Sequence, residues 1–184
     1  FPTRRSSDLD LWVYNKLFLN SRLGHLCGPV GCPVPSPGYY IVRPSINLLG
    51  MGRFSRLEWI ENCTDHLHPA EFWCEIFKGN HISVDFKNKK PELVVLGEKY
   101  DDNTLYKWKK WTKIDMNVEF PEILNNLKGD YEWINCEFID NKVIEVHFRR
   151  NPDFRYKNTV AIPVWNDQKI ENIPNLKFIE DQDY

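Results

Sequence analysis

The sequence predicts an α+β chain made mostly of short strands. Aromatic residues make up 14% of the chain, and they occur with branched aliphatic residues in short runs. Twelve prolines and nine glycines lie between these runs, and such residues mark turns and loops. Two stretches instead have apolar residues at helical spacing. With 184 residues and 42% hydrophobic content, the chain can form one substantial core or two small subdomains that share an interface.

The two helical stretches lie far apart in the chain. Residues 10–23 have the first helical pattern, and Gly24 ends it. Residues 119–127 have a short amphipathic pattern with Pro121 in the first turn, where proline is well tolerated. Between them, residues 27–38 are too rich in proline and glycine for regular structure, so we predict a loop there.

The other apolar runs predict strands, because they are short and rich in branched and aromatic residues. These predicted strands cover residues 39–42, 56–61, 72–77, 81–86, 92–96, 134–139, 143–148 and 160–165. The turn sequence Lys78-Gly79-Asn80 predicts that 72–77 and 81–86 pair as a hairpin, and Asp140-Asn141-Lys142 predicts the same for 134–139 and 143–148. We expect the polar tail from Asn166 to fray.

Overall composition gives few functional clues. The formal charge is −2, so no global charge points to a nucleic acid or a membrane as partner. No apolar run approaches the ~20 residues that a membrane-spanning helix needs. Five cysteines without signal-peptide context favour reduced thiols and a cytoplasmic location. Cys27 and Cys32 lack the usual CxxC spacing and a second Cys/His pair nearby, so the sequence does not favour a zinc site.

The first nine residues are set aside from the fold. Residues 1–9 resemble a translated adapter sequence of the kind found at the ends of shotgun-assembled reading frames. We therefore expect them to be non-native and the chain to be a fragment truncated at its N-terminus.

The most informative stretch is the predicted hairpin of residues 134–148. Along its second strand Glu145 and His147 stand at alternate positions, and Arg149 follows at the same spacing, so all three project from one face. Glu137 on the first strand is expected on the same face. Two carboxylates and one further N or O donor can hold Mg²⁺ on bound phosphates, and an arginine can neutralise a phosphoryl group. The alternative is a solvated edge hairpin with cross-strand ion pairs.

Four features follow one another along the chain. A helix carries Lys16, and a strand that ends at Arg43-Pro44 leads into a glycine-bearing loop. The strand pair around Glu75 comes next, and the acidic hairpin comes last. This order of elements resembles the ATP-grasp superfamily over residues 10–155. Taken singly, a helix lysine or a surface arginine is ordinary, and it is the order of the elements that favours the family.

The resemblance implies a fold and a division of the chain. It implies an ATP-grasp-like α+β fold, in which two α+β subdomains with mainly antiparallel sheets face each other across a nucleotide cleft. The smaller subdomain would cover about residues 30–75 and the larger, catalytic part about 76–155. Residues 156–184 would then form a C-terminal strand and a polar tail.

The resemblance also implies roles for residues in the first half of the chain. Lys16 and Arg43 would reach the phosphates of ATP, with Arg43 also catalytic. Gly50 and Gly52 would let the backbone close over the phosphates. The segment Glu75, Ile76 and Phe77 would border the adenine, and His81 stands where an acidic residue often holds the ribose hydroxyls.

The acidic hairpin would supply the metal site and a further catalytic residue. The resemblance implies that Glu137, Glu145 and His147 bind Mg²⁺ and that Arg149 steadies the phosphates or an acyl-phosphate. Three matched positions depart from the family pattern: Arg43 replaces a lysine, His81 a carboxylate and His147 an asparagine. Imidazole is a softer donor than Mg²⁺ prefers, and it loses its lone pair when protonated.

Three functions follow from these patterns. The first is an ATP-dependent ligase that activates a small-molecule carboxylate as an acyl-phosphate for attack by an amine or a thiol. The second is a catalytically impaired nucleotide-binding or protein-interaction module, suggested by the three unusual positions. The third is a strand-rich interaction domain, in which the Lys/Trp segment of residues 106–113 could stack on single-stranded nucleic acid. The balance of charge makes the third the least favoured.

Overall fold

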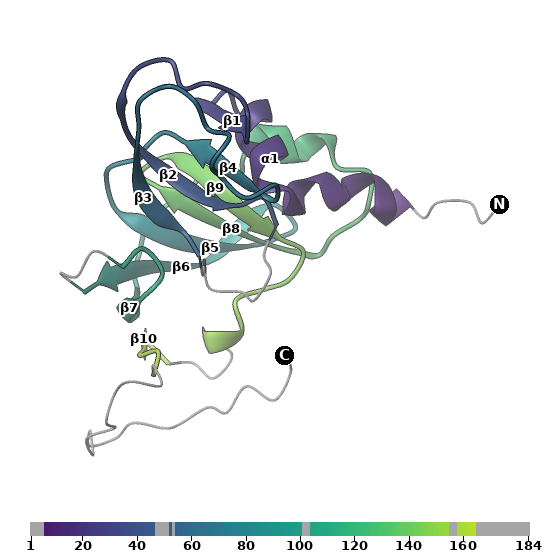
Figure 1. Cartoon of the computed structure of the whole chain (residues 1–184). Helices are drawn as coiled ribbons and strands as arrows, with labels where there is room; N and C mark the ends of the chain where they lie inside the picture. The colour runs from purple at the N-terminus through teal and green to yellow at the C-terminus, as the bar shows by residue number, and fades with distance from the viewer. Residues whose placement is uncertain (1–5, 47–51, 53, 101–103, 155–157, 165–184) are drawn as a thin grey trace.

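The computed structural model describes residues 6–46, 52, 54–100, 104–154 and 158–164 of the chain. It has an α+β fold with two antiparallel sheets, which confirms the predicted fold class (Figure 1). The helical elements are η1 (Ser6–Tyr14), α1 (Lys16–Arg22), η2 (Glu122–Asn126) and η3 (Pro152–Phe154). The strands are β1 (Cys27–Pro29), β2 (Gly38–Pro44), β3 (Arg56–Ile60), β4 (Glu71–Cys74), β5 (His81–Lys87), β6 (Lys90–Lys99), β7 (Trp108–Lys113), β8 (Trp133–Ile139), β9 (Lys142–His147) and β10 (Val160–Ala161).

The four-stranded sheet is formed by the first part of the chain, in the order β1-β4-β2-β3. Its core contains Val42, Ile60 and Trp73, all almost fully buried. The short strand β1 pairs Cys27 with Cys74, and β2 begins at Gly38, although residues 27–38 were predicted to be a loop, so that prediction was wrong for four residues. The Pro/Gly-rich sequence of residues 27–29 does not favour a strand by itself, and the strand forms because these residues pair with β4.

The six-stranded sheet has the order β10-β7-β6-β5-β8-β9, again antiparallel throughout. One face carries a larger core, to which Val84 and Cys136 contribute from the sheet. Val13 and Leu19 pack on that face from η1 and α1, and both are buried. The residues that alternate with the core residues therefore face the other way, toward the four-stranded sheet.

The predicted hairpin between residues 72–77 and 81–86 does not form. Strand β4 pairs with β1 and β2, whereas β5 pairs with β6 and β8 in the other sheet. The turn sequence Lys78-Gly79-Asn80 is real, with Gly79 at φ +133°, but the chain uses it to cross between the sheets. Residues 75–80 are consequently the connection between the two sheets.

The first predicted helix is divided in two. Residues 6–14 form the 3₁₀ helix η1, and α1 begins after Asn15, whose Oδ1 accepts a hydrogen bond from the Phe18 N–H at 3.0 Å. An asparagine cap of this kind favours a new helix start over continuation of the preceding turn. Helix α1 contacts both β1 and β9, so it touches both sheets. The part of the chain that the structure describes contains no helix long and apolar enough to cross a membrane.

Candidate functional site

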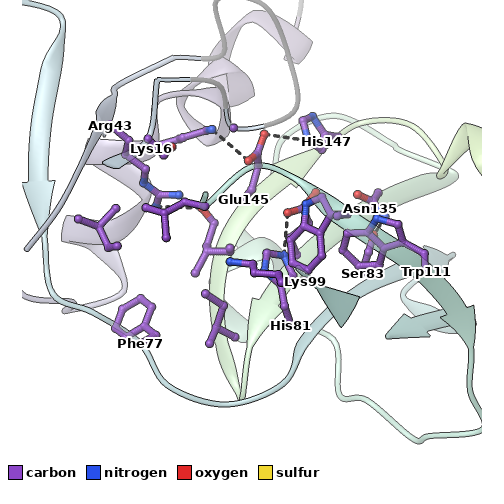
Figure 2. Close-up of a pocket in the computed structure, with 18 of the residues that line it drawn as sticks. Lys16, Arg43, Phe77, His81, Ser83, Lys99, Trp111, Asn135, Glu145 and His147 are labelled. Atoms are coloured by element: carbon purple, nitrogen blue, oxygen red, sulfur yellow. Dashed lines mark hydrogen bonds and ion pairs between the residues drawn. The ribbon is translucent and has the colours of Figure 1, made fainter. Parts of the chain in front are cut away.

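The two sheets enclose a cavity of about 330 Å³ that is open to solvent. Its lining includes every candidate site residue that the structure describes: Lys16, Arg43, Gly52, Glu75, Ile76, Phe77, His81, Glu137, Glu145, His147 and Arg149. Gly50 was also a candidate, and it lies outside the described residues. Segments from both ends of the chain therefore converge on one space between the sheets (Figure 2).

The hairpin β8–β9 presents its acidic residues to this cavity. Glu137 lies opposite Glu145 in the strand register, while Cys136 and Val146 point into the core. The register shifts between Glu137 and Phe138, which is a β-bulge. A bulge inserts an extra residue and changes the alternation of faces. As a result Ile144 lines the cavity next to Glu145, although strict alternation would turn it to the core.

The three predicted metal ligands lie close enough together to share a metal ion. One ligand atom each from Glu137, Glu145 and His147 lies within 4.8 Å of the others. The Lys16 Nζ lies 3.0 Å from Oε2 of Glu145, and Nε2 of His147 lies 3.0 Å from its Oε1 (Figure 2). With a side chain only 12% exposed, Glu145 is a largely desolvated carboxylate that lies 3.0 Å from two side-chain nitrogens. Two facing carboxylates and an imidazole can ligate a divalent cation.

His81 contacts the acidic pair directly. Its Nε2 lies 3.0 Å from Oε2 of Glu137, and its ring packs edge-on against Trp108 at 4.5 Å between centroids. Its Nδ1 is buried and has no hydrogen-bond partner within the described ranges. In this arrangement the imidazole orients the Glu137 carboxylate.

Arg43 projects from the end of β2 between the two sheets. It is 8% exposed, its guanidinium lies 5.3 Å from the Phe72 ring centre, and its Nη2 donates to the carbonyl of Ile144 at 3.4 Å. Its Nε is buried without a hydrogen-bond partner, and no described carboxylate forms an ion pair with it. A buried cation without a carboxylate partner at the cavity wall suits an anionic ligand.

The connection between the sheets is fixed by Glu75 and Phe77. Oε1 of Glu75 accepts from the Leu26 N–H at 2.9 Å, and its Oε2 lies 3.7 Å from Nζ of Lys142. The Phe77 ring contacts both His25 (4.7 Å between ring centres) and the Lys142 ammonium (4.3 Å). Burial lowers the pKa of His25, and the nearby Glu75 offsets part of that effect. The connection is thus tied to β1 and to the β8–β9 turn.

Sequence reasoning missed two groups at this cavity. The first is Lys99 on β6 with Trp108 and Trp111 on β7, and both tryptophans contact His81. Burial lowers the pKa of Lys99, although the charge of Glu137 acts in the opposite direction. In the sequence, residues 107–113 contain four lysines, which is typical of a solvent-exposed strand and not of a cavity wall. Gly97 and Lys99 stand at alternate positions and therefore on one face of β6. A glycine inside a strand could have indicated that other groups approach the backbone closely on that face.

The second missed group is a buried polar network below Arg149. The Asp85 carboxylate accepts from the Asn151 N–H at 2.8 and 3.0 Å and from Nδ2 of Asn135 at 2.8 Å. Asn135 also donates to Oγ of Ser83 at 2.8 Å. Strand β9 ends at His147, and the network holds the backbone of Asn151, two residues after Arg149. The serine, aspartate and asparagine have no distinctive spacing in the sequence.

Comparison with known proteins gives structural matches alone. No family model and no curated protein matches the sequence. Among solved structures, a protein from Archaeoglobus fulgidus described as an ATP-grasp superfamily member has 12% identity and a TM-score of 0.43, and the match covers 75% of this chain and 46% of that one.

The ATP-grasp ligase PsnB, complexed with its minimal precursor, has 14% identity and a TM-score of 0.46, covering 82% of this chain and 54% of that one. A second PsnB structure, complexed with a phosphomimetic precursor variant, Mg and ADP, has 14% identity and a TM-score of 0.42, with coverage of 82% and 52%. The chain therefore spans about half the length of the solved chains that it matches.

Proposed function

We propose that this chain is the nucleotide-binding and catalytic part of an ATP-grasp-type ligase. It activates a small-molecule carboxylate as an acyl-phosphate, which an amine or a thiol then attacks. The observation that supports the proposal best is the convergence of two cations, Lys16 and Arg43, and two carboxylates, Glu137 and Glu145, on one cavity between the sheets. A triphosphate with a divalent cation needs this combination of charges.

The adenine is assigned to the end of the cavity beside the connection. Ile41, Leu57, Ile139 and Ile144 supply aliphatic walls there from both sheets. Planar bases bind well between apolar surfaces of this kind, and nearby backbone groups such as those of Ile76 can pair with the base edge. The phosphates would then extend toward Lys16 and Arg43.

Magnesium would be held by Glu137, Glu145 and His147. When bound, Mg²⁺ neutralises charge on the transferring phosphoryl group and orients it. Glu145 now pairs with Lys16 at 3.0 Å. A cation held at Glu145 would weaken that pair and would let Lys16 contact the phosphates. His81 keeps Glu137 oriented through its Nε2 contact.

The reaction needs little covalent chemistry from the protein. A substrate carboxylate oxygen attacks the γ-phosphorus, the bond from that phosphorus to the β,γ-bridging oxygen breaks, and ADP leaves. The amine or thiol then attacks the acyl carbon, loses its proton and expels inorganic phosphate. Arg43 and Arg149 line the cavity where charge builds up on the phosphoryl oxygens. All five cysteines are free, and we place the reaction in the reducing cytoplasm.

The test is ATP titration by calorimetry, with and without Mg²⁺. For the unchanged chain we expect Mg²⁺ to strengthen ATP binding, and for Glu145→Gln we expect that gain to fall by about 100-fold or more. Glu98→Gln is the matched control, because Glu98 pairs with surface lysines outside the cavity. Failure of ATP to bind would overturn the proposal. Binding that does not respond to Mg²⁺ would instead indicate the catalytically impaired nucleotide-binding module.

A further inference from the structure

Two tryptophans form one floor of the cavity on the six-stranded sheet. The ring centres of Trp108 and Trp111 lie 4.4 Å apart, and both contact the edge of His81. The rings lie over Gly97, where an added Cβ would come within 2.5 Å of Trp108 and 2.9 Å of Trp111. This close approach of two indoles to the backbone requires glycine. We call Trp108, Trp111 and Lys99 the aromatic subsite.

Lys99 gives this subsite a positive charge. Its ammonium lies 4.8 Å from the centre of the Trp108 ring and lines the same cavity (Figure 2). No carboxylate in the described ranges lies within ion-pair distance of it. Burial also lowers the pKa of Lys99, in line with an ammonium that has lost part of its water. Such a cation favours an anionic partner.

The aromatic subsite is separate from the aliphatic end assigned to the adenine. Ile139 and Ile144 belong to β8 and β9 at one edge of the sheet, whereas Trp108 and Trp111 belong to β7, with β6 and β5 between them and β8. Figure 2 shows Trp111 at the far side of the pocket from Phe77 and Arg43. His81 on β5 lies between the two ends, where it contacts Glu137 on one side and both tryptophans on the other. A second ligand can therefore occupy the aromatic end beside a bound nucleotide.

We propose that the aromatic subsite binds the carboxylate substrate, and that this substrate carries a planar apolar group. The inference rests on the proposed ligase function. The planar group stacks on Trp108 and Trp111, and the carboxylate pairs with Lys99. This places a carboxylate oxygen beside Glu137, next to the assigned phosphate site. An aromatic acid meets both requirements, whereas a short aliphatic acid meets one.

The charges of the same strand argue against a nucleic acid as the occupant. Lys109 and Lys110 are both bound by Glu98, with Nζ to oxygen distances of 2.7 and 2.9 Å. A phosphate backbone would have to displace this carboxylate from both lysines. The two indoles also line a cavity about 330 Å³ in volume, which suits a small molecule.

The experiment is calorimetry of the 184-residue chain with phenylacetate, phenylacetamide and acetate, each in the presence of Mg²⁺ and a non-hydrolysable ATP analogue. We expect phenylacetate to bind at least about tenfold more tightly than either of the others, since each lacks the charge or the ring. Lys99→Met should weaken phenylacetate by about tenfold or more, and Trp111→Leu by about fivefold. Lys113→Met and Trp59→Leu, both at exposed side chains on the same two sheets, should leave it unchanged.

The outcomes separate this inference from the ligase proposal, because analogue binding is measured first in every variant. If the analogue binds and phenylacetate does not bind better than acetate, the aromatic subsite is wrong and the nucleotide site stands. Equal phenylacetate binding by Lys99→Met and by the unchanged chain also overturns it. If the analogue itself does not bind, both proposals fail.

Discussion

Glu71 in the four-stranded sheet and Asp85 in the six-stranded sheet are both buried carboxylates, with 7% and 3% exposure, yet their surroundings differ. The guanidinium of Arg56 binds Glu71 through two nitrogens, and the His68 N–H donates to it at 3.1 Å. Asp85 receives its hydrogen bonds from the neutral groups of Asn151 and Asn135.

The two pKa values move in opposite directions for this reason. Burial alone would raise the pKa of Glu71, but the hydrogen bonds and charge of Arg56 outweigh it and lower that pKa. Burial raises the pKa of Asp85, and the hydrogen bonds from Asn151 and Asn135 offset only part of the effect. A buried carboxylate with a cation stabilises its sheet, whereas one without a direct cationic partner costs free energy and points to a positioning task.

The largest expected effect is on Glu71. We expect Glu71→Gln to lower the free energy of unfolding by about 1–3 kcal/mol, because it removes the partner of Arg56 and leaves the His68 N–H with a weaker acceptor. The lower part of this range reflects the 41% exposure of the Arg56 side chain. The measurement is the urea midpoint, with Glu58→Gln as control, since Glu58 binds the same arginine from a more exposed position. An unchanged midpoint for Glu71→Gln would contradict the comparison.

A smaller effect is expected on ligand binding when Asp85 is changed. Asp85→Asn keeps the size of the side chain but replaces one acceptor of the Asn151 N–H with a donor. The segment that carries Arg149 should shift, and Mg²⁺–ATP affinity should fall by about tenfold with little change in the urea midpoint. The measurement is the Mg²⁺–ATP affinity by calorimetry, compared between Asp85→Asn and Glu71→Gln. Nucleotide affinity that falls equally in both variants would show that the loss is a general effect of stability.

The smallest effect is a difference in pH dependence. Glu71 has a folded pKa below its ordinary 4.5, so its contribution to stability is complete above about pH 4.5 and is lost as the pH falls through the lower value. Asp85 has a folded pKa above its ordinary 3.8, so its relative stability is highest below pH 3.8 and declines as the pH rises through the raised value. Unfolding curves from pH 3 to 7 for Glu71→Gln and Asp85→Asn should therefore diverge from the unchanged chain with opposite slopes. If the stability difference from the unchanged chain varied with pH in the same direction for both variants, the opposite pKa shifts of Glu71 and Asp85 would be refuted.

The sequence predicted the parts of the fold that follow a simple period. The alternation along β9 places Glu145 and His147 on the cavity face, because a strand with one buried face fixes the other. The turn signal at residues 78–80, in contrast, led to a wrong prediction. The sequence there favours a hairpin, but strand partners in two different sheets determine the path of the chain.

The candidate site was predicted only where residue type and spacing are distinctive. The pairing of His81 with Glu137 joins positions that are not directly opposite in the register, so no spacing rule indicates it. Lys16 and Glu145 come from distant segments, and their contact depends on α1 touching β9. The roles of these residues in binding remain predictions, to be decided by the titrations described above.

Gly97 has a consequence for how ligands of different thickness are distinguished. Because Gly97 has no Cβ, both indole rings can pack directly against the strand backbone, and this packing determines the depth of the cavity at that point. Replacement by alanine would lift the rings toward the opposite sheet and make the space shallower without altering any charge. Flat molecules would then be excluded before narrow aliphatic ones, so this single backbone position would determine which ligand shapes fit the cavity.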